Sequence, residues 1–495
     1  MHALPGVGYR PESLKKCRGV DFVRVSNETA EVSEDLVVGI DSSTQSCKAL
    51  LVRADDGTVV DQVSAPHPDG TEVDPRAWLD ALRQATAPLL ERASAVAVGG
   101  QQHGMVALGA DDEPVRPALL WNDVRSAPQA ADLVREWGGP QACADAVGSV
   151  LVASFTAAKL RWLRDHEADH AAAVRQVLLP HDYLTWHLTE RSDAPTTDRG
   201  DASGTGYFST RTDHWRADLA ADALGHEVGL PRVAGPAEAV GRTAHGALVA
   251  AGTGDNMAAA LGLQLRPGDV AVSIGTSGVA SVVSRTPAAD PSGEVAGFAD
   301  ASGAFLPLVC TLNAARVLDT TARLLGVDHA GLAELALSAE PGAGGLTLLP
   351  YLDGERTPNR PDAAGTLHGL TTGTSREQLA RAAVEGLLCS LADAVDRLTA
   401  VTGTAAERVV LVGGGARNEA VRRLAPALFG CPVVVPGAAE YVALGAARQA
   451  AWALNAGDEP PSWSLPDVHT FEAEPTPHVR EAYTRLRDRT EDWSS

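Results

Sequence analysis

Two aspartates in turns of small residues are the groups best suited to chemistry in this chain. Asp41 ends the apolar run 36–41 (LVVGID) and is followed by the polar turn 42–46 (SSTQS). In such a turn, backbone N–H groups and hydroxyls can point at phosphate oxygens while the carboxylate holds Mg²⁺ or its water ligands. The pattern predicts a metal and phosphate site at Asp41. An ordinary turn or helix cap uses the same residue types and stays an open alternative.

Asp255 lies in a second loop of this kind, AGTGDN (251–256), directly before the alanine-rich stretch MAAALG. Gly252 and Gly254 permit a tight backbone path there. The simplest role for Asp255 is to cap the helix that begins at this point. The alternative is a general base that takes the proton of an attacking hydroxyl. The residues alone leave both roles open.

A polar loop, GQQHG (100–104), follows another apolar run. Open α/β sheets bind ligands at the carboxyl ends of their strands, so Gln101, Gln102 and His103 could form hydrogen bonds with a polyol. A single histidine in a loop is more often structural. Trp121, in the sequence Trp-Asn-Asp, suits a core position as well as the wall of a ligand site.

A glycine run at 413–415 resembles part of a dinucleotide-binding fingerprint, but the position of the third glycine is occupied by Asn418. A Rossmann dehydrogenase is therefore disfavoured. The pattern G-x-x-x-x-G-K-[ST] is absent, which excludes a P-loop kinase. A glycine-rich turn that opens a helix still suits adenosine or phosphate contacts.

Alternating strands and helices must position these loops. The apolar runs 36–41, 48–52 and 95–100 predict buried strands, and Asp74 followed by Pro75 predicts a helix that reaches about Arg92. This alternation predicts an α/β architecture.

A similar strand–turn–strand unit begins at 269 and continues through the turn 275–278 to about 283. Two such units predict an internal duplication with one copy in each domain, and a chance likeness of two small-residue turns is the alternative. A capping box at 375–378 predicts a helix to about Ala400, followed by a strand at 408–412.

Composition narrows the function classes. A chain of 495 residues exceeds one hydrophobic core, so two domains are expected. A net charge of −22 disfavours nucleic acid and anionic membranes as partners. The six cysteines have no zinc-site spacing and indicate a reducing, cytoplasmic setting. Residues 1–35 show no secretory signal, and we expect a disordered extension there or an incorrectly chosen upstream start.

Taken in order, these segments resemble the FGGY carbohydrate kinases and, within that family, the xylulokinases. The resemblance runs from about residue 36 to 454, and ten motifs carry it: GIDSSTQS, GQQHG, WND, SFTAAKLRW, LLPHDYL, TTDRGDASGTG, GTGDN, SIGTSG, LPYLDGERTPNRP and GGGARNE. Each motif is weak alone, but coincidence of all ten in this order is remote. The HG loop, WND and YLDGERTP favour a xylulokinase over a glycerol or gluconate kinase.

The resemblance implies an α/β fold of two domains of the actin/hexokinase (ribonuclease H-like) type with a central cleft. It implies an N-terminal domain over 36–265 for sugar, phosphate and Mg²⁺, a C-terminal domain over 266–455 for ATP, and a peripheral segment over 456–495. The activity it implies is ATP-dependent phosphorylation of D-xylulose to D-xylulose 5-phosphate, a step of pentose catabolism.

Site roles are also carried over from the family. Asp255 would be the general base and Asp41 would hold the metal. The sugar would contact the residues Gln102, His103, Trp121, Asp255 and Asn256. Phosphate and adenosine would contact the residues Ser43, Thr44, Gly275, Thr276, Ser277, Gly414, Gly415 and Asn418.

Two departures from the family pattern keep the substrate open. Ser43 replaces a glycine that many relatives have in the first turn, and Gln102 stands where many xylulokinases have Met. The alternatives are a kinase for ribulose, L-xylulose, fuculose or another polyol, and a non-catalytic sugar-binding regulator. The oligomeric state is also open, with a homodimer as one option.

Overall fold

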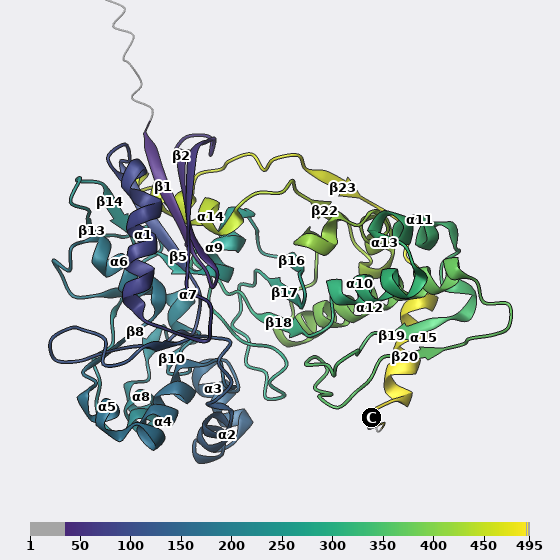
Figure 1. Cartoon of the computed structure of the whole chain (residues 1–495), viewed down its shortest axis with the longest axis horizontal. Helices are drawn as coiled ribbons and strands as arrows, with labels where there is room; N and C mark the ends of the chain where they lie inside the picture. Colours follow the sequence, from purple (N-terminus) through teal and green to yellow (C-terminus); the bar gives the residue numbers. More distant parts are fainter. Residues whose placement is uncertain (1–34, 492, 494–495) are drawn as a thin grey trace, which may run out of the picture. The chain divides into compact units, whose positions relative to one another are not determined.

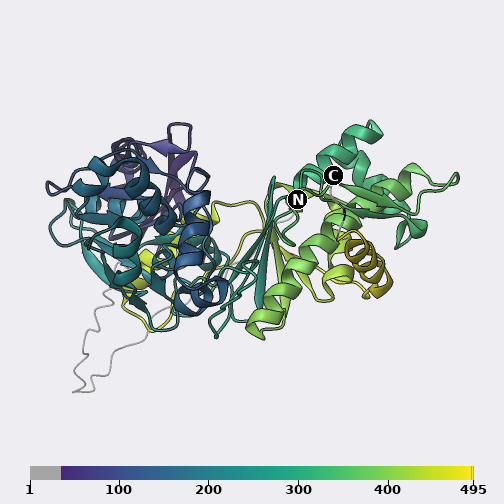
Figure 2. The same ribbon diagram turned by 90° about the horizontal axis from the view of Figure 1, so that it is seen from below.

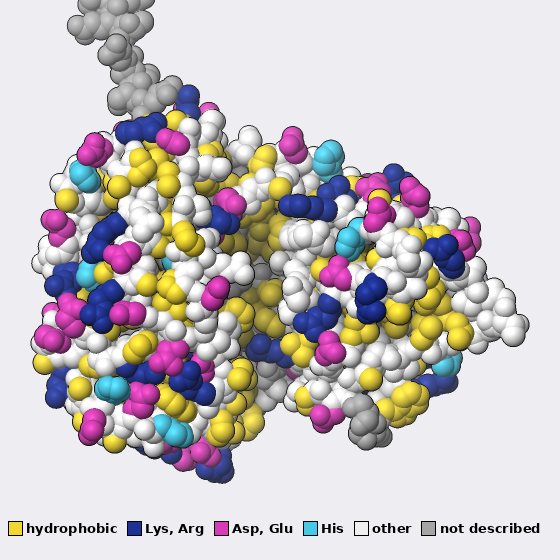
Figure 3. All heavy atoms as spheres, in the orientation of Figure 1, with side chains coloured by type: hydrophobic (Ala, Val, Ile, Leu, Met, Phe, Trp, Pro, Cys, Tyr) yellow, Lys and Arg dark blue, Asp and Glu magenta, His cyan; other side chains and the backbone are white. Residues whose placement is uncertain are grey.

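The computed structural model describes residues 35–491 and 493. The extension expected over residues 1–35 therefore lies outside the described residues, except for Asp35. Within the described part, no helix has the length and apolar character needed to cross a membrane. On the face drawn in Figure 3, described Lys and Arg side chains lie among Asp and Glu side chains instead of forming a separate basic patch.

The first large sheet contains the strand at whose end Asp41 lies. Its central strands pair side by side, β1 antiparallel to β2 and parallel to β5, so that Asp41 is opposite both Lys48 and Gly99. Its strands, in spatial order, are β13 (Ala239–Arg242), β14 (Leu248–Ala250), β5 (Ala95–Gly100), β1 (Leu36–Ser42), β2 (Ser46–Arg53) and β3 (Val59–Pro66), with β15 (Thr253–Gly254) also paired to β5. β1 and β5 are buried on both faces, as their unbroken apolar sequences predict.

The second large sheet repeats this pattern. β16 is antiparallel to β17 and parallel to β21, as β1 is to β2 and β5, and the next strand on each side also pairs in the same sense as its counterpart. Its spatial order is β18 (Leu308–Thr311), β17 (Gly278–Val282), β16 (Asp269–Ile274), β21 (Arg408–Val412), β22 (Val433–Val435) and β23 (His469–Phe471). The predicted internal duplication is confirmed by this shared topology.

Two helices begin at the capping residues predicted from sequence. α1 (Pro75–Leu90) begins after Asp74, whose side chain accepts a hydrogen bond from the Arg76 N–H. α12 (Arg376–Thr402) begins with a capping box in which Ser375 and Gln378 bond each other's backbone N–H groups. Figure 2 shows α12 as a long helix that packs against the second sheet.

The other elements are shorter. The remaining helices before the second sheet are α2 (Ala127–Glu136), α3 (Pro140–Val147), α4 (Thr156–His166), α5 (Ala168–Ala173), α6 (Pro180–Leu188), α7 (Arg199–Ala202), α8 (Ala217–Leu224) and α9 (Asp255–Gly262). Those after it begins are α10 (Ala315–Leu325), α11 (His329–Ser338), η1 (Ala343–Gly345), η2 (Gly414–Arg417), α13 (Glu419–Phe429), α14 (Tyr441–Asn455) and α15 (Pro477–Arg489). Short two-stranded pairs complete the fold: β4 (Glu72–Val73), β6 (Val106–Leu108), β7 (Ala118–Leu119), β8 (Gln176–Leu178), β9 (Thr196–Asp198), β10 (Phe208–Ser209), β11 (His214–Trp215), β12 (Arg232–Ala234), β19 (Thr347–Leu349) and β20 (Thr366–His368).

α14 comes late in the chain but contacts the first sheet. Although its residues fall within the expected C-terminal domain, the helix packs on the first sheet, beside β1 and β5 (Figure 1). Glycines make this contact possible, because a Cβ on Gly39 would lie 1.9 Å from the Ala443 carbonyl oxygen and one on Gly445 would lie 1.7 Å from that of Ala258. The helix of Asp255, α9, is thereby held backbone to backbone against α14.

The segment 456–495, expected to be peripheral, also contributes to the second core. β23 pairs with β22 at the edge of the second sheet. α15 places Val479, Tyr483 and Leu486 in the same buried cluster as the residues of α12. The prediction of a peripheral segment rested on its Pro- and Glu-rich composition and overlooked the apolar face of α15.

Candidate active site

Asp41 lies at the end of β1, where the strand runs into its turn. The side chain is 5% exposed, and its Oδ1 atom is buried with no hydrogen-bond partner among the described residues. Burial raises the pKa of Asp41 above its ordinary value, although the Ser43 hydrogen bond and the charge of Lys48 oppose the rise. A buried carboxylate oxygen without a partner is destabilising unless a ligand satisfies it. The oxygen donor therefore fits a hard cation such as Mg²⁺.

Lys48 and Glu440 lie beside this carboxylate, and the sequence analysis did not select either of them. Lys48 Nζ lies 2.7 Å from Glu440 Oε2, and both charges act on Asp41. The antiparallel register of β1 and β2, which places Lys48 opposite Asp41, is a signal that could have found the lysine. Glu440 had no local signal, since it approaches only because α14 returns to the first sheet.

Asp255 is the first residue of α9, and Gly254 occupies the cap position. The helix-cap role left open from sequence is therefore wrong. The Asp255 carboxylate accepts a hydrogen bond of 2.8 Å from the Asn256 N–H. Desolvation raises its pKa to about 7, with further contributions from the negative charges of Asp41 and Asp201. A carboxylate with this pKa is a stronger proton acceptor than an ordinary aspartate, which suits a general base at neutral pH.

Gln102 and Asn256 link the loop 100–104 to the start of α9. Asn256 Nδ2 donates to Gln102 Oε1 at 2.9 Å, while Gln102 Nε2 is buried without a partner among the described residues. This amide therefore keeps a free donor beside Asp255. Gln101 is also buried, and its Oε1 is likewise without a partner in the described part of the chain.

His103 is held in one tautomer. Its Nδ1 lies 2.6 Å from the Gly204 carbonyl oxygen, which can only accept, so Nδ1 carries the proton. Burial lowers the pKa of His103 to about 3, and the imidazole is therefore neutral with Nε2 as an acceptor. The ring packs near Phe155 and Phe298, with centroids 5.2 and 5.6 Å away. A neutral acceptor between aromatic rings suits a sugar hydroxyl.

Trp121 is a surface residue and not part of the core. Its side chain is 46% exposed, and its indole Nε1 donates to Thr44 Oγ1 at 2.9 Å. The hydrogen bond joins the Trp-Asn-Asp loop to the turn that follows Asp41. Of the two roles left open from sequence, the wall of a ligand site is the one compatible with this exposure.

A separate cavity of about 770 Å³ adjoins the turn between β16 and β17. It brings together four of the glycines and polar residues predicted for phosphate and adenosine, Gly275, Thr276, Gly414 and Gly415, and Asn418 also lines it. Asn418 uses its side chain to cap α13, accepting from Ala420 and Val421 N–H groups. Ser277 is exposed and does not line the cavity.

Half of the residues that line the cavity come from α10 and α11, which the sequence analysis did not select. Leu318, Ala333 and Leu337 provide its apolar surface. An apolar wall next to a glycine-rich turn suits a purine ring with its phosphates on the backbone N–H groups. The amphipathic pattern of α10 was visible in sequence, but nothing local indicated which cavity it would border.

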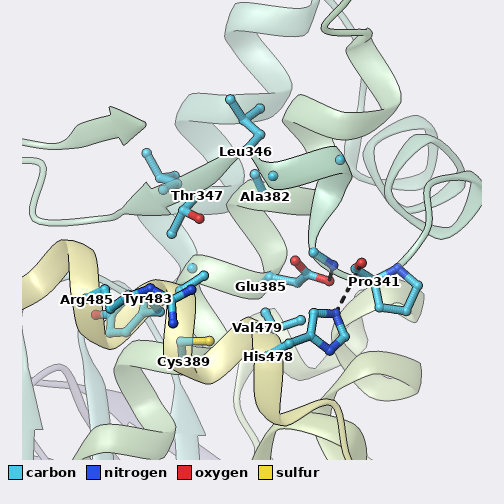
Figure 4. Close-up of a pocket in the computed structure, with 16 residues that line it drawn as sticks. Pro341, Leu346, Thr347, Ala382, Glu385, Cys389, His478, Val479, Tyr483 and Arg485 are labelled. Atoms are coloured by element: carbon cyan, nitrogen blue, oxygen red, sulfur yellow. Dashed lines mark hydrogen bonds between the residues drawn. The ribbon is translucent and has the colours of Figure 1, made fainter. Parts of the chain in front are cut away.

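A smaller cavity of about 300 Å³ lies between η1, α12 and α15 (Figure 4). None of the predicted site residues lines it. Its carboxylate, Glu385, already accepts from the Gly342 N–H and from Arg381 Nε. Its Tyr483 hydroxyl is bonded to that of Tyr351. These polar groups stabilise the second core and are separate from the candidate active site.

Comparison with known proteins agrees with this arrangement. Residues 36–262 match the N-terminal domain of the FGGY family of carbohydrate kinases, and residues 270–454 match its C-terminal domain. The xylulose kinase of Streptomyces coelicolor is 51% identical over 438 residues, covering 86% of this chain and 89% of that protein. The xylulose kinase of Streptomyces rubiginosus is 50% identical over 445 residues, with the same coverage.

Among solved structures, the xylulose kinase of Bifidobacterium adolescentis has a TM-score of 0.87 and 44% sequence identity, covering 92% of this chain and 99% of that one. The two-domain α/β fold of the actin/hexokinase type, expected from the motifs, is confirmed by this likeness and by the repeated sheets.

Proposed function

Because this chain belongs to the FGGY family of carbohydrate kinases, we propose that its reaction is the ATP-dependent phosphorylation of D-xylulose to D-xylulose 5-phosphate. The observation that carries the proposal is Asp255, whose pKa is raised to about 7 by burial and by the nearby Asp41 and Asp201 carboxylates. Curated relatives with half of their residues identical to this chain are xylulose kinases, which supports D-xylulose as the acceptor.

Asp255 would take the proton of the sugar's 5-hydroxyl while that oxygen attacks the γ-phosphoryl group in line. Phosphoryl transfer needs positioning and charge neutralisation more than covalent chemistry from the protein. The free donor of Gln102 Nε2 and the acceptor of His103 Nε2 would orient the sugar hydroxyls, with Asn256 and Trp121 beside them. Held in this way, the hydroxyl is close to the base before the phosphoryl group arrives.

ATP is the phosphoryl donor of this kinase. The adenosine would lie in the cavity bordered by α10, α11, Gly414 and Gly415, with phosphates on the turns at Ser43–Thr44 and 275–277. Mg²⁺ held by Asp41 would supply positive charge to the phosphate oxygens, which an acidic protein needs for a nucleotide. The charge of Lys48 also acts on Asp41.

The experiment that tests the proposal is ADP release with Mg-ATP and a panel of D-xylulose, D-ribulose, L-ribulose, L-xylulose, L-fuculose and glycerol. We expect the highest kcat/KM with D-xylulose, by a wide margin. A different preferred sugar would keep the kinase and overturn the substrate, and the loop with Gln102 would be the place to look. ATP binding without turnover on any sugar would favour a non-catalytic sugar-binding regulator.

We place this reaction in pentose catabolism in the cytoplasm. The reduced thiols implied by the cysteine spacing suit that compartment. Whether the enzyme works as a homodimer is a separate question, which light scattering at working concentrations answers directly.

A further inference from the structure

A buried cluster of ionisable side chains lies behind the two loops of the candidate sugar site. It contains His181 and Asp182 at the start of α6, and Asp198 and Asp201 at α7, all almost completely shielded from solvent. His181 Nδ1 lies 2.6 Å from Asp201 Oδ2 and 3.3 Å from Asp182 Oδ1. None of these groups contacts the substrate in the mechanism above, where Asp201 acts only through its charge on Asp255. Burying them together is unfavourable unless their negative charges are offset.

A proton on His181 offsets part of this negative charge. Burial by itself lowers the pKa of His181, but the charges of Asp182, Asp201 and Asp198 outweigh it and raise the pKa to about 9. The spacing of His181, Asp182 and Asp201 would also suit a cation. However, Nδ1 lies at hydrogen-bond distance from the Asp201 carboxylate, so this nitrogen donates a proton there and is not the atom that would hold a cation.

The cluster is joined to the loop of Asp255 through Thr253. Thr253 Oγ1 donates to Asp198 Oδ2 at 2.8 Å, and Asp198 also caps α7 by accepting from the Gly200 and Asp201 N–H groups. Thr253 lies two residues before Asp255 on β15. On the other side of Thr253 the loop lies directly against the imidazole, since a Cβ on Gly252 would come within 2.7 Å of His181 Cδ2.

The same cluster is joined to the loop of His103. The carbonyl of Gly204, just after α7, fixes the His103 tautomer. At the other end of that loop, a Cβ on Gly100 would come within 2.7 Å of the His181 Cβ atom. One buried cluster therefore touches both loops that face the sugar.

We propose that His181, Asp201, Asp198 and Thr253 form a positioning network that holds the Asp255 and His103 loops in the geometry that proton removal requires. The inference rests on the proposed function, since it assigns the network to the kinase reaction. Its residues are positioning residues, because each acts through another group and not on the substrate. The expected consequence is that loosening the network lowers kcat while ATP binding, which uses another cavity, is unaffected.

A pair of substitutions at Thr253 tests the network. Thr253→Val keeps the shape of the side chain and removes the hydroxyl, while Asp198 Oδ2 retains the Gly200 N–H as a partner. We expect kcat to fall about tenfold to a hundredfold, with KM for ATP within about twofold of the wild type, because a small displacement of a catalytic group is costly. Thr253→Ser keeps the hydroxyl and should recover most of kcat.

Thr86→Val is the matched control, because Thr86 is also buried and donates to a backbone carbonyl in α1, away from the site. Its kcat should equal that of the wild type at a comparable loss of Tm. A Thr253→Val enzyme with wild-type kcat, or a Thr253→Ser enzyme as slow as Thr253→Val, overturns the network. A wild-type enzyme with no turnover on any sugar refutes the proposed function instead.

A second pair keeps the inference testable if Thr253→Val does not fold. His181→Gln removes the buried cation, and His187→Gln changes a half-buried histidine on the same helix that has no contact with the cluster. We expect His181→Gln to lose at least about tenfold in kcat and His187→Gln to keep it. Equal kcat for the two variants would show that the cluster stabilises the fold only.

Discussion

The first and second sheets share one strand pattern, but the residues at the turns of their central hairpins, β1–β2 and β16–β17, differ in charge. In the first, β1 carries Asp41 next to its last residue, just before the turn, with Lys48 opposite it on β2. In the second, β16 ends in Ser273 and Ile274, and its turn consists of Gly275, Thr276 and Ser277, so neither carries a charge. The Asp41 side chain is buried, whereas Thr276 and Ser277 are exposed. The same backbone unit therefore presents a buried carboxylate in one copy and uncharged donors in the other.

This difference explains how an acidic chain can bind a nucleotide. A carboxylate suits a cation, whereas a turn of N–H groups and hydroxyls attracts phosphate oxygens without a nearby negative charge to repel them. The first copy also contributes a neighbouring charge that raises the pKa of Asp255. In the proposed mechanism, the acceptor and metal sites therefore belong to the first copy and the adenosine cavity to the second, while the phosphates lie between the turns of both.

The largest effect that this comparison predicts is that of Asp255→Asn. The amide keeps the size of the side chain but cannot take a proton, so kcat should fall by roughly 10³–10⁴-fold. Binding of ATP, measured by calorimetry, should remain within about twofold of the wild type because its cavity belongs to the second copy. An Asp255→Asn enzyme with substantial turnover would remove the base assignment, and loss of ATP binding would show that the two regions are not separable.

Asp41→Asn should give the next largest effect. The amide keeps one oxygen but loses the negative charge proposed to hold Mg²⁺, and we expect kcat to fall by about 10²-fold with a higher Mg²⁺ requirement. The same change should stabilise the protein without ligands, since a buried carboxylate oxygen without a partner is unfavourable. Kinetics at several Mg²⁺ concentrations and a melting curve measure both. An unchanged Mg²⁺ dependence would place the metal elsewhere.

The pH dependence of kcat/KM should report the ionisation of Asp255. Asp255 must be ionised to act as a base, and its pKa is raised to about 7 in the free protein. As pH falls below this value the ionised fraction is lost, so kcat/KM should decrease about tenfold per pH unit. Rates between pH 5.5 and 8.5 at saturating Mg-ATP test this. A flat profile down to pH 5.5 would mean that the carboxylate titrates in its ordinary range.

Sequence signals that act over a few residues predicted the structure well. The Asp74 cap, the Ser375 capping box and the apolar runs at 36–41 and 408–412 all correspond to observed elements. The loops predicted for sugar contacts also meet, as the hydrogen bond between Gln102 and Asn256 shows. These features depend on backbone propensity and on motifs that keep their order along the chain.

What could not be predicted depends on segments that are far apart in sequence. Glu440 lies beside Lys48 because α14 packs on the first sheet. That packing depends on close contacts at glycines, which no local sequence pattern predicts. The effect of Asp201 on Asp255 requires α7 to lie behind the loop 251–256. The helix-cap role for Asp255 was wrong because Gly254 already satisfies the cap position with extended backbone.

The smallest effect should come from filling the nucleotide cavity of the second copy. Ala330 lines this cavity from α11 and is exposed, so Ala330→Trp adds bulk there without disturbing the core. We expect KM for ATP to rise about fivefold, equal to roughly 1 kcal/mol of lost binding, with kcat within about twofold of the wild type. Ser338→Trp is the control, since it places the same ring at an exposed position on the same helix that does not line the cavity. If Ala330→Trp instead changed KM for the sugar, or if the control had the same effect, the division between an acceptor region and a nucleotide region would be wrong.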